Sequence, residues 1–480
     1  MKPAAKLFEN PFLGIMLGII GICILLNYVF LRNIYQPHNT DNTWTLALIH
    51  DYMADGITDD PIVRRGPSSW NAEGLKFFRR THALIYGQIL SITGWNYRNA
   101  QTISAILVLL AGALWVPILR KLNFSRNFSL VYIALFFFLE FSLTAATNLR
   151  EEAFLLTLQS LGFLLVIERR YVWAGLVSAV ALETHPIGLM NLALPICWIF
   201  AEQAQNRSHE NHRFVPIFAK LLAGLGLGGI YYWFVYKNNA LDIFRYALSH
   251  TGKIDPNAKW GYGALGQYFF ATKYFRHLPE LFLLFFSLYI FMNKKIYKER
   301  LFIIIALPAL IVLSSIRDNF FYAILIYPVF LLVIVSAFEY IRKLGALLAL
   351  CFLLMAPQYS FVYYLNHRWD RETYLKEIMD MVPRDNLPVL GSAPAWFALM
   401  DKNFKDAISS PEIFSRLDFR EFYLLEDRFT RDEKVYANLL RHIRSHYDET
   451  PVGTADMHGN HLVLKRMVAL EVARESSGRK

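Results

Sequence analysis

The chain has 480 residues, of which 55% are hydrophobic and 18% are charged, and its net charge is +10. Its mean hydropathy is positive, which excludes an ordinary soluble globular protein and indicates a polytopic membrane protein. Most of the basic excess lies in short joints between apolar runs, where lysine and arginine set membrane orientation. We therefore expect no nucleic-acid partner.

The first apolar run, Phe12 to Leu31, is close to the ~20 residues needed to cross hydrocarbon. No small-residue cleavage site follows it, which predicts a retained signal anchor. Together with the later runs it predicts about eleven spans. The later runs are Gln101 to Leu119, Phe128 to Thr147, Ala153 to Ile167, Val172 to Leu182, Ile187 to Ala201, Val215 to Tyr236, Pro279 to Met292, Leu301 to Ser315, Phe320 to Phe338 and Leu344 to Tyr363.

Basic residues occur in alternate joints, on the side of Lys2 and Lys6, and this predicts a cytoplasmic N-terminus. The opposite, outer side then receives the polar features that lack a basic excess. These are the first loop at 33–81, the Arg150-Glu151-Glu152 joint, the Thr184-His185-Pro186 joint, residues 237–278, the Arg317-Asp318-Asn319 joint and the tail.

Two segments decide whether this alternation holds. His82 to Ile92 is too short for a span, and we interpret it as an amphipathic helix on the outer membrane surface. The region from Val172 to Ala201 is interpreted as two short helices that meet at the polar break Glu183 to Pro186, where proline can end a helix. The glycines at 224–229 lack the Lys-Ser/Thr of a phosphate loop, and they predict close helix packing.

Residues 1–365 are therefore interpreted as a transmembrane domain and residues 366–480 as a small α/β domain on the outer, periplasmic side. The tail is charged and mixed in pattern. Its predicted elements are helices at Asp370 to Met381 and Asp432 to Tyr447, and strands at Pro388 to Ser392, Glu421 to Leu425 and His461 to Lys465. His442 and His446 share a helix face, but without a third ligand we interpret that face as solvated.

The first loop carries Asp41 a few positions beyond the membrane boundary, and we hypothesise that it is a catalytic base. The next outer acids are Glu151 and Glu152, beside Arg150. Two readings stay open for them. They can cap a helix N-terminus and favour its dipole, or one can face Asp41 across an outer cavity beside an arginine that binds phosphate.

His185 precedes a proline at the predicted helix break. A buried, hydrogen-bonded histidine is one reading, and a site residue at irregular backbone that lines a watery cavity is the other. Arg317 and Asp318 are either interfacial anchors or a source of positive charge for an anionic lipid headgroup.

Five segments together resemble the type C glycosyltransferase superfamily, particularly the bacterial relatives of protein O-mannosyltransferases and of the aminoarabinose transferase that modifies lipid A. The resemblance rests on their order and on the predicted topology. Ala83 and Leu84 replace two prolines of the family pattern, and Asn42 replaces a common second acid. The segments are Asp41 after span one, Thr81-His82-Ala83-Leu84-Ile85-Tyr86, Asn148 to Glu152, Glu183 to Gly188, and Phe320-Phe321-Tyr322 followed by Tyr327-Pro328.

The resemblance implies an inner-membrane enzyme that moves a sugar from a polyprenyl-phosphate donor to a glycan, lipid or protein acceptor at the outer face, with inversion. It implies Asp41 as the base, with Glu151 or Glu152 as the second carboxylate. The implied substrate-binding residues are His82, His185 and Tyr322, with Arg150, Arg317, Arg64, Arg65 or Lys76 as candidates to steady the leaving phosphate.

No dedicated ligand cluster indicates a metal cofactor, although paired carboxylates can hold a divalent cation beside a phosphate. A transporter or flippase for a lipid-linked sugar is the main alternative. It is disfavoured because no internal repeat is visible and the polar residues collect on one face. A membrane scaffold with the tail as its binding module is a third reading.

Overall fold

A computed structural model covers the whole chain. The residues it describes are 40–55, 80–205, 214–236, 301–314, 324–338, 371–400, 402, 404–406, 419–428, 430, 434–457 and 460–470, with single residues at 289, 292 and 360. The chain folds into two compact units. The helix-bundle unit holds the described residues of 78–82 and 101–362, and the mixed unit holds those of 34–77, 83–100 and 363–480.

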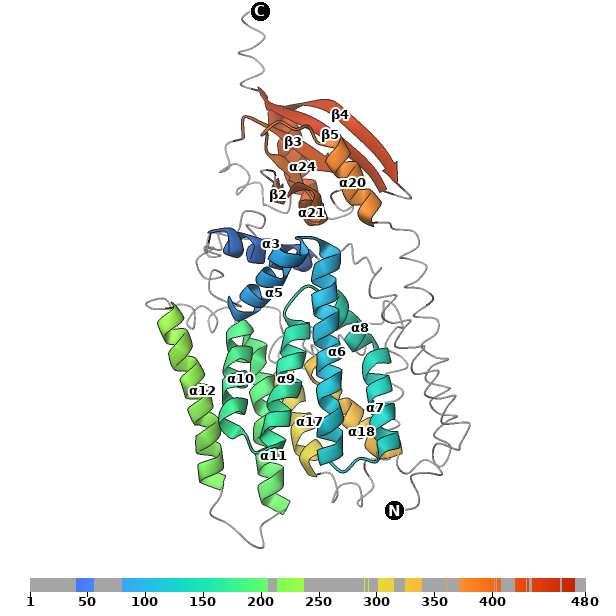
Figure 1. Cartoon of the computed structure of the whole chain (residues 1–480). Helices are drawn as coiled ribbons and strands as arrows, with labels where there is room; N and C mark the ends of the chain where they lie inside the picture. The colour runs from blue at the N-terminus through green and yellow to red at the C-terminus, as the bar shows by residue number, and fades with distance from the viewer. Residues whose placement is uncertain are drawn as a thin grey trace, which may run out of the picture. The chain divides into compact units, whose positions relative to one another are not determined.

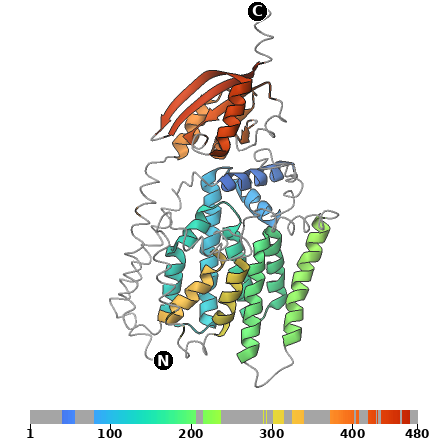
Figure 2. The same cartoon turned by 180° about the vertical axis from the view of Figure 1, so that it is seen from behind.

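The helix-bundle unit is a set of apolar helices that lie side by side (Figures 1 and 2). Helix α9 packs against α10 and α11, α10 against α12, and α7 against α18. The bounds are α6 (Tyr97–Lys121), α7 (Arg126–Phe138), α8 (Glu140–Thr147), α9 (Glu152–Ile167), α10 (Tyr171–Thr184), η1 (Pro186–Gly188), α11 (Leu189–Gln205), α12 (Phe214–Tyr236), α17 (Leu301–Ser314) and α18 (Tyr327–Phe338).

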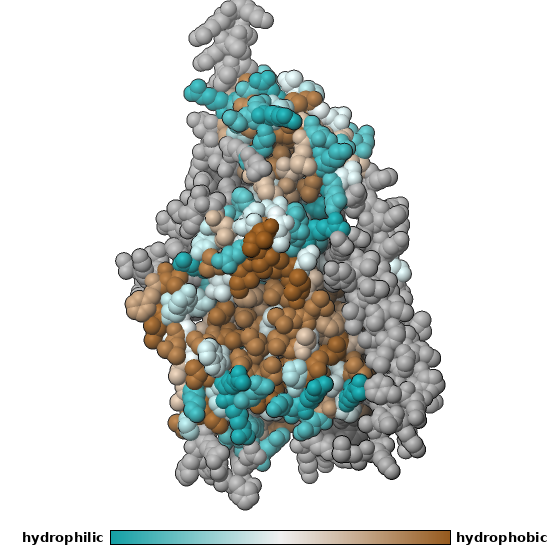
Figure 3. All heavy atoms as spheres, viewed as in Figure 1, coloured by the Kyte–Doolittle hydropathy of each residue, from teal (hydrophilic) through white to brown (hydrophobic). Residues whose placement is uncertain are grey.

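Two of the described helices, Tyr97–Lys121 and Phe214–Val235, are long and apolar enough to cross a membrane. A third candidate is the bent pair Phe128–Phe138 and Phe141–Thr147. On the face in Figure 3, hydrophobic side chains cover the middle of the bundle and hydrophilic ones gather at its lower end. The structure therefore fits a membrane protein, while the count of eleven spans, five of which lie wholly or partly outside the described residues, stays a prediction.

The span predicted from Phe128 to Thr147 is bent, because the two helices α7 and α8 meet at an angle of 50°. Leu139 adopts an extended conformation between them. The Ser142 hydroxyl donates to the Phe136 carbonyl, and such local bonds offer the backbone an alternative to the helix ladder.

The glycines of α12 do serve helix packing, as predicted. A Cβ at Gly224 would collide with the Val172 backbone of α10, and one at Gly228 would collide with Ala179. Gly175 of α10 makes the reciprocal approach to the α12 backbone. A Cβ at Gly226 or Gly229 would have no atom within 4 Å, so only two of the four glycines make this contact.

The mixed unit contains a five-stranded sheet of order β2-β1-β3-β5-β4. Strand β1 pairs parallel with β2 and β3, and β5 pairs antiparallel with β3 and β4. Helix α24 supplies Leu439 and Ile443 to the core on the sheet. The elements are α20 (Arg371–Met381), β1 (Val389–Gly391), η5 (Ala393–Ala395), α21 (Trp396–Leu399), β2 (Phe404–Asp406), β3 (Glu421–Glu426), α24 (Lys434–His446), β4 (Tyr447–Met457) and β5 (Asn460–Ala469).

The predicted α/β character of the tail is confirmed, and each of its predicted elements occurs. Two strands were missed. Strand β2 has only three residues, which is too short for a sequence pattern to show. Strand β4 contains Pro451 beside a register shift, is mostly exposed and lacks a clear alternating pattern. Proline and irregular pairing suit an edge strand, and β4 lies at the edge of the sheet.

The first loop also contains a helix that was not predicted. Helix α3 spans Thr40–Asp55. Its buried face includes Leu46, Ala47 and Ile49, and the polar residues around them made the segment resemble a loop. The helix predicted at 82–92 is confirmed as α5, Arg80–Thr93. Ile89 and Ile92 are exposed on it, and its place on the membrane surface stays a prediction.

Candidate active site

The candidate site begins at the joint between α8 and α9. Asn148 ends α8 in an extended conformation, and the Ser104 hydroxyl of α6 donates to its carbonyl over 2.9 Å. Glu152 is the first residue of α9, and Glu151 precedes it without a side-chain cap bond. The positive end of the helix dipole stabilises carboxylates at a helix N-terminus, which explains in part why two acids are tolerated here.

Arg150, Glu151 and Glu152 are all buried, with side-chain exposures of 7%, 1% and 4%. Arg150 Nε lies 3.1 Å from Glu152 Oε1, and Arg150 Nη2 lies 3.8 Å from Glu151 Oε1. Transfer of a charged group from water to the protein interior costs on the order of several kcal/mol per ion, and attraction to an oppositely charged partner offsets this cost. The three side chains therefore act as one electrostatic group, and removal of Arg150 takes the cation away from two buried acids.

His185 joins this group from the end of α10. The Ile187 backbone N–H donates to His185 Nδ1 over 3.1 Å, so the neutral imidazole carries its proton on Nε2. Nε2 lies 3.6 Å from Glu151 Oε1. The histidine thus presents its N–H toward the carboxylate, and the backbone turn fixes that choice of tautomer.

Gly188 allows this turn to form. A Cβ at this position would collide with the carbonyl oxygen and carbon of Ala181 in the last turn of α10. The Gly188 N–H donates to the His185 carbonyl over 2.8 Å. A glycine therefore lets η1 fold back on α10 and hold the imidazole beside α9. The predicted break of the 172–201 region into two helices is confirmed here.

A second polar group lies at the start of α5. The Thr81 backbone N–H faces both carboxylate oxygens of Glu183 at 3.4 Å, and the Thr81 hydroxyl shares a hydrogen bond of 2.8 Å with the Tyr232 hydroxyl of α12. Next to it, the buried His82 ring packs against Phe154 of α9 at 5.8 Å between centroids. Glu183 thus caps α5 and holds the His82 segment against the bundle.

The structure brings four predicted site residues together: Arg150, Glu151, Glu152 and His185. His82 lies against the same helix, α9. Asp41 is the second residue of α3 in the mixed unit, and its pairing with Glu151 or Glu152 stays a prediction. Lys76, Arg317 and Tyr322 lie outside the described residues, as do Arg64 and Arg65.

Glu183 and Tyr232 were not predicted as site residues. An ionisable residue inside an apolar run is a functional candidate by default, so Glu183 carried a usable signal. Tyr232 carried none, because it is one of many aromatic residues in α12. In the described part of the chain, no three His, Cys, Asp or Glu side chains are grouped so that they could hold a metal ion.

Chemically, the group offers two buried carboxylates, one guanidinium and one oriented imidazole. Carboxylates can accept hydrogen bonds from sugar hydroxyls or remove a proton as a bond forms. An arginine suits phosphate oxygens because its planar fork matches their geometry. The group thus combines acids and a cation, which are the chemical groups that recognition of a sugar phosphate requires.

Two solved structures share this fold. The crystal structure of ArnT from Cupriavidus metallidurans in the apo state matches with a TM-score of 0.61 and 13% identity, over 95% of this chain and 98% of that chain. The structure of the same protein bound to undecaprenyl phosphate matches with a TM-score of 0.55 and 14% identity, over 94% and 98%.

No protein-family model matches the sequence, and no curated protein matches it. The structural match covers nearly the whole of both chains, so it includes the bundle and the tail alike. This chain therefore shares the fold of ArnT, as the resemblance predicted from five short segments led us to expect.

Proposed function

We propose that the chain is a membrane glycosyltransferase that moves a sugar from a polyprenyl-phosphate donor to a glycan, lipid or protein acceptor at the outer face of the inner membrane. The observation that carries the proposal is the buried group of Arg150, Glu151, Glu152 and His185 in a chain of this fold. Buried charges at a helix break are expensive to keep, and in membrane proteins they mark functional sites.

The donor class is supported by the structural neighbour that was crystallised with undecaprenyl phosphate. A lipid phosphate is already a fair leaving group, so the protein mainly has to stabilise its developing negative charge. Arg150 is the described candidate for this task, with Arg317, Lys76 and Tyr322 proposed beside it. When a phosphate approaches, the guanidinium is able to exchange part of its contact with Glu152 for the new anion.

The acceptor requires a base. An acceptor hydroxyl has a high pKa, so a carboxylate must take its proton as attack proceeds, which is worth roughly 10²–10⁴ in rate. We assign this role to Asp41 and propose Glu151 or Glu152 as the second carboxylate, which orients the sugar with His185 and His82. Displacement in one step inverts the anomeric centre.

The end of α12 supports a site at the bilayer edge. Its last turns carry exposed aromatic residues, Tyr231, Trp233 and Phe234, and aromatic side chains collect at membrane–water boundaries. Tyr232, in the same turn, is bonded to Thr81. The polar group at Thr81 and Glu183 is therefore level with this aromatic turn, where a lipid can keep its chain in hydrocarbon and its phosphate near polar groups.

The test uses the purified full chain in lipid nanodiscs with a panel of undecaprenyl-phosphate sugars and candidate glycan, lipid and peptide acceptors. Mass analysis follows the lipid. We expect time-dependent release of undecaprenyl phosphate from at least one donor, and release that depends on the acceptor. In proteoliposomes, a donor that crosses the bilayer and is recovered intact would contradict the proposal and indicate a flippase.

A further inference from the structure

The mixed unit contains a cluster that joins the first loop to the C-terminal α/β domain. Its members come from α3, from the joint between α5 and α6, and from α20 and α21. We call this cluster the aromatic anchor. It consists of His50, Trp95, Tyr97, Arg371, Trp396 and Phe397.

His50 connects α3 to the α5–α6 joint and to α21 of the C-terminal domain. Its ring lies 4.8 Å from the Trp95 ring at 82° and 5.8 Å from the Trp396 ring at 80°, measured between centroids. Both are edge-to-face arrangements, which aromatic rings prefer to direct stacking. One side chain of the first loop is therefore held by an aromatic residue of the α5–α6 joint and by one of the C-terminal domain.

Arg371 connects α20 to the start of α6. Its guanidinium carbon lies 3.3 Å from the Tyr97 ring centroid and 4.7 Å from that of Phe397. The two rings are themselves 5.5 Å apart at 89°. Tyr97 and Phe397 are buried, and a cation over a desolvated aromatic face is a strong contact. The same segments also meet through the exposed ion pair of Arg98 and Glu372 at 3.2 Å.

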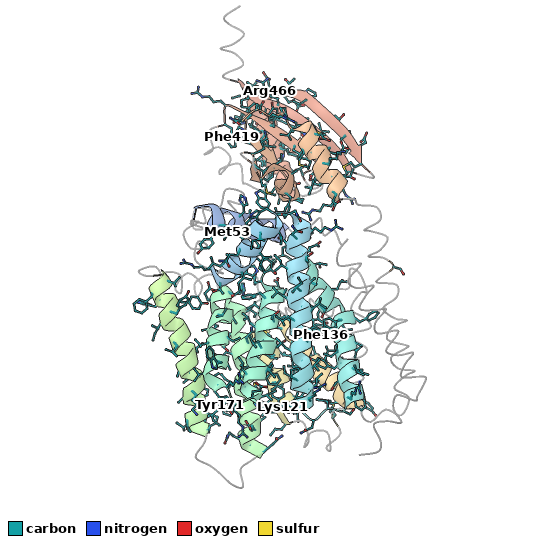
Figure 4. All side chains as sticks on the ribbon, viewed as in Figure 1. Met53, Lys121, Phe136, Tyr171, Phe419 and Arg466 are labelled. Carbon is teal, nitrogen blue, oxygen red and sulfur yellow. The ribbon has the colours of Figure 1, made fainter. Side chains whose placement is uncertain are left out.

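Helix α3 is also held by buried side chains and by a close contact with α5. Thr43, Thr45 and Ile49 are at most 3% exposed. A Cβ at Gly87 of α5 would collide with the Met53 side chain of α3, so the two helices meet at this glycine; Met53 is labelled in Figure 4. Asp41 lies nine residues before His50 on α3, which is about 14 Å along the helix.

We infer that the C-terminal α/β domain is a positioning element for the helix that carries Asp41, and that Arg371, Trp396 and Phe397 are its positioning residues. The catalytic consequence rests on the proposed function, because it takes Asp41 as the base. A misplacement of about 1 Å can reduce a rate about 10²-fold. The C-terminal domain thereby controls the geometry of the base.

The direct test is hydrogen exchange of the full chain in nanodiscs, which needs no donor. Loss of the aromatic contacts in Trp396→Ala or Arg371→Ala should speed exchange of the α3 amides from Thr43 to His50 about tenfold. Exchange in β3 and β5 should stay as in the wild type. Trp396→Phe, which keeps a ring edge, should restore most of the protection. Unchanged α3 exchange in both alanine variants would overturn the inference.

Leu439→Ala is the matched control, because Leu439 is fully buried in the sheet core and is not part of the anchor. It should raise exchange around β3 and α24 and leave α3 protected. If it raises α3 exchange as much as Trp396→Ala does, α3 follows the general stability of the domain and the anchor has no specific role.

The second arm measures release of undecaprenyl phosphate from whichever donor the wild type uses. Trp396→Ala should lower kcat about 10- to 100-fold and leave the KM for the donor unchanged, because the residues proposed to contact the donor are not part of the anchor. A rise in KM with kcat unchanged would overturn a positioning role. If the wild type turns over no donor, the proposed function fails, while the exchange result still decides whether the domain holds α3.

Discussion

The two units of the chain each bury acidic side chains, and they satisfy them in different ways. In the mixed unit, Asp427 Oδ2 accepts from the Tyr374 hydroxyl at 2.8 Å and the Ser392 hydroxyl at 2.5 Å, and Oδ1 accepts from the Thr430 N–H at 2.8 Å. All three donors are neutral. In the helix-bundle unit, Arg150 instead lies 3.1 Å from Glu152 and 3.8 Å from Glu151 as their cationic partner, and His185 Nε2 lies 3.6 Å from Glu151.

We propose that this difference separates a structural carboxylate, Asp427, from the candidate functional ones, Glu151 and Glu152. Short neutral hydrogen bonds at the ends of β1 and β3 tie Asp427 to its own domain. Two of the three contacts at Glu151 and Glu152 are longer than a hydrogen bond, and such contacts can shorten or exchange when a ligand arrives. The group at α9 is therefore our candidate for a group that changes partners during a reaction.

The largest expected effect is that of Asp41→Asn on turnover. Removal of the base should lower the rate of sugar transfer by about 10²- to 10⁴-fold, while binding of undecaprenyl-phosphate sugar is retained. Equilibrium binding of a labelled donor and single-turnover release would be compared in one preparation. Transfer at the wild-type rate would remove Asp41 from the mechanism and leave the α9 group to act without it.

Arg150→Ala should be the most destabilising change in the α9 group. Loss of one partner from a buried ion pair costs about 3–5 kcal/mol, because Glu152 remains buried and charged. Thermal unfolding in nanodiscs would show this, and apparent donor affinity should fall with it. Arg150→Lys keeps the charge and should lose mainly affinity. A stable Arg150→Ala protein with unchanged donor affinity would place Arg150 outside both roles.

Gly188→Ala tests whether the turn holds His185 in place. The added Cβ meets backbone atoms of Ala181 that cannot move aside, so we expect a loss of about 1–3 kcal/mol and a fall in turnover. Gly226→Ala is the control, since nothing lies within 4 Å of its Cβ position, and it should be neutral. Equal behaviour of the two variants would show that the turn does not position the imidazole.

The pH response of Asp427 should be the smallest effect. Burial raises the pKa of this carboxyl above its usual range, against the lowering effect of its hydrogen bonds. The neutral form therefore stabilises the folded domain below the unfolded pKa of about 3.9, and this contribution is lost as pH rises through the raised folded pKa. Asp427→Asn lacks the titration, so its stability relative to the wild type should improve as pH rises from about 4.

Hydrogen exchange in β1 and β3 at several pH values, corrected for intrinsic rates, would measure this difference. A stability difference between wild type and Asp427→Asn that stays constant with pH would show that the carboxyl is not shifted.

The sequence predicted the parts of the site that depend on chain-local signals. A charged triplet between apolar runs and a His-Pro break were visible as Arg150 to Glu152 and His185. Asp427 was not visible, because it looks like any acid that follows a strand. Its burial depends on Tyr374 and Ser392, which are 53 and 35 residues away.

Helix α3 was missed for a related reason. Its sequence is polar enough to suggest a loop, and its buried face appears only when α5 and the C-terminal domain pack against it. The bend at Leu139 likewise has no proline or glycine to announce it. Tertiary contacts, rather than local preference, decide these features.

The most direct test of the comparison is the turnover of Glu151→Gln and Glu152→Gln beside Asp427→Asn, measured as release of undecaprenyl phosphate from the donor that the wild type uses. We expect at least one glutamine variant to lose about 10²-fold or more in kcat while hydrogen exchange shows it folded, and Asp427→Asn to keep the wild-type rate. Full turnover in both glutamine variants would contradict a reactive role for the α9 group.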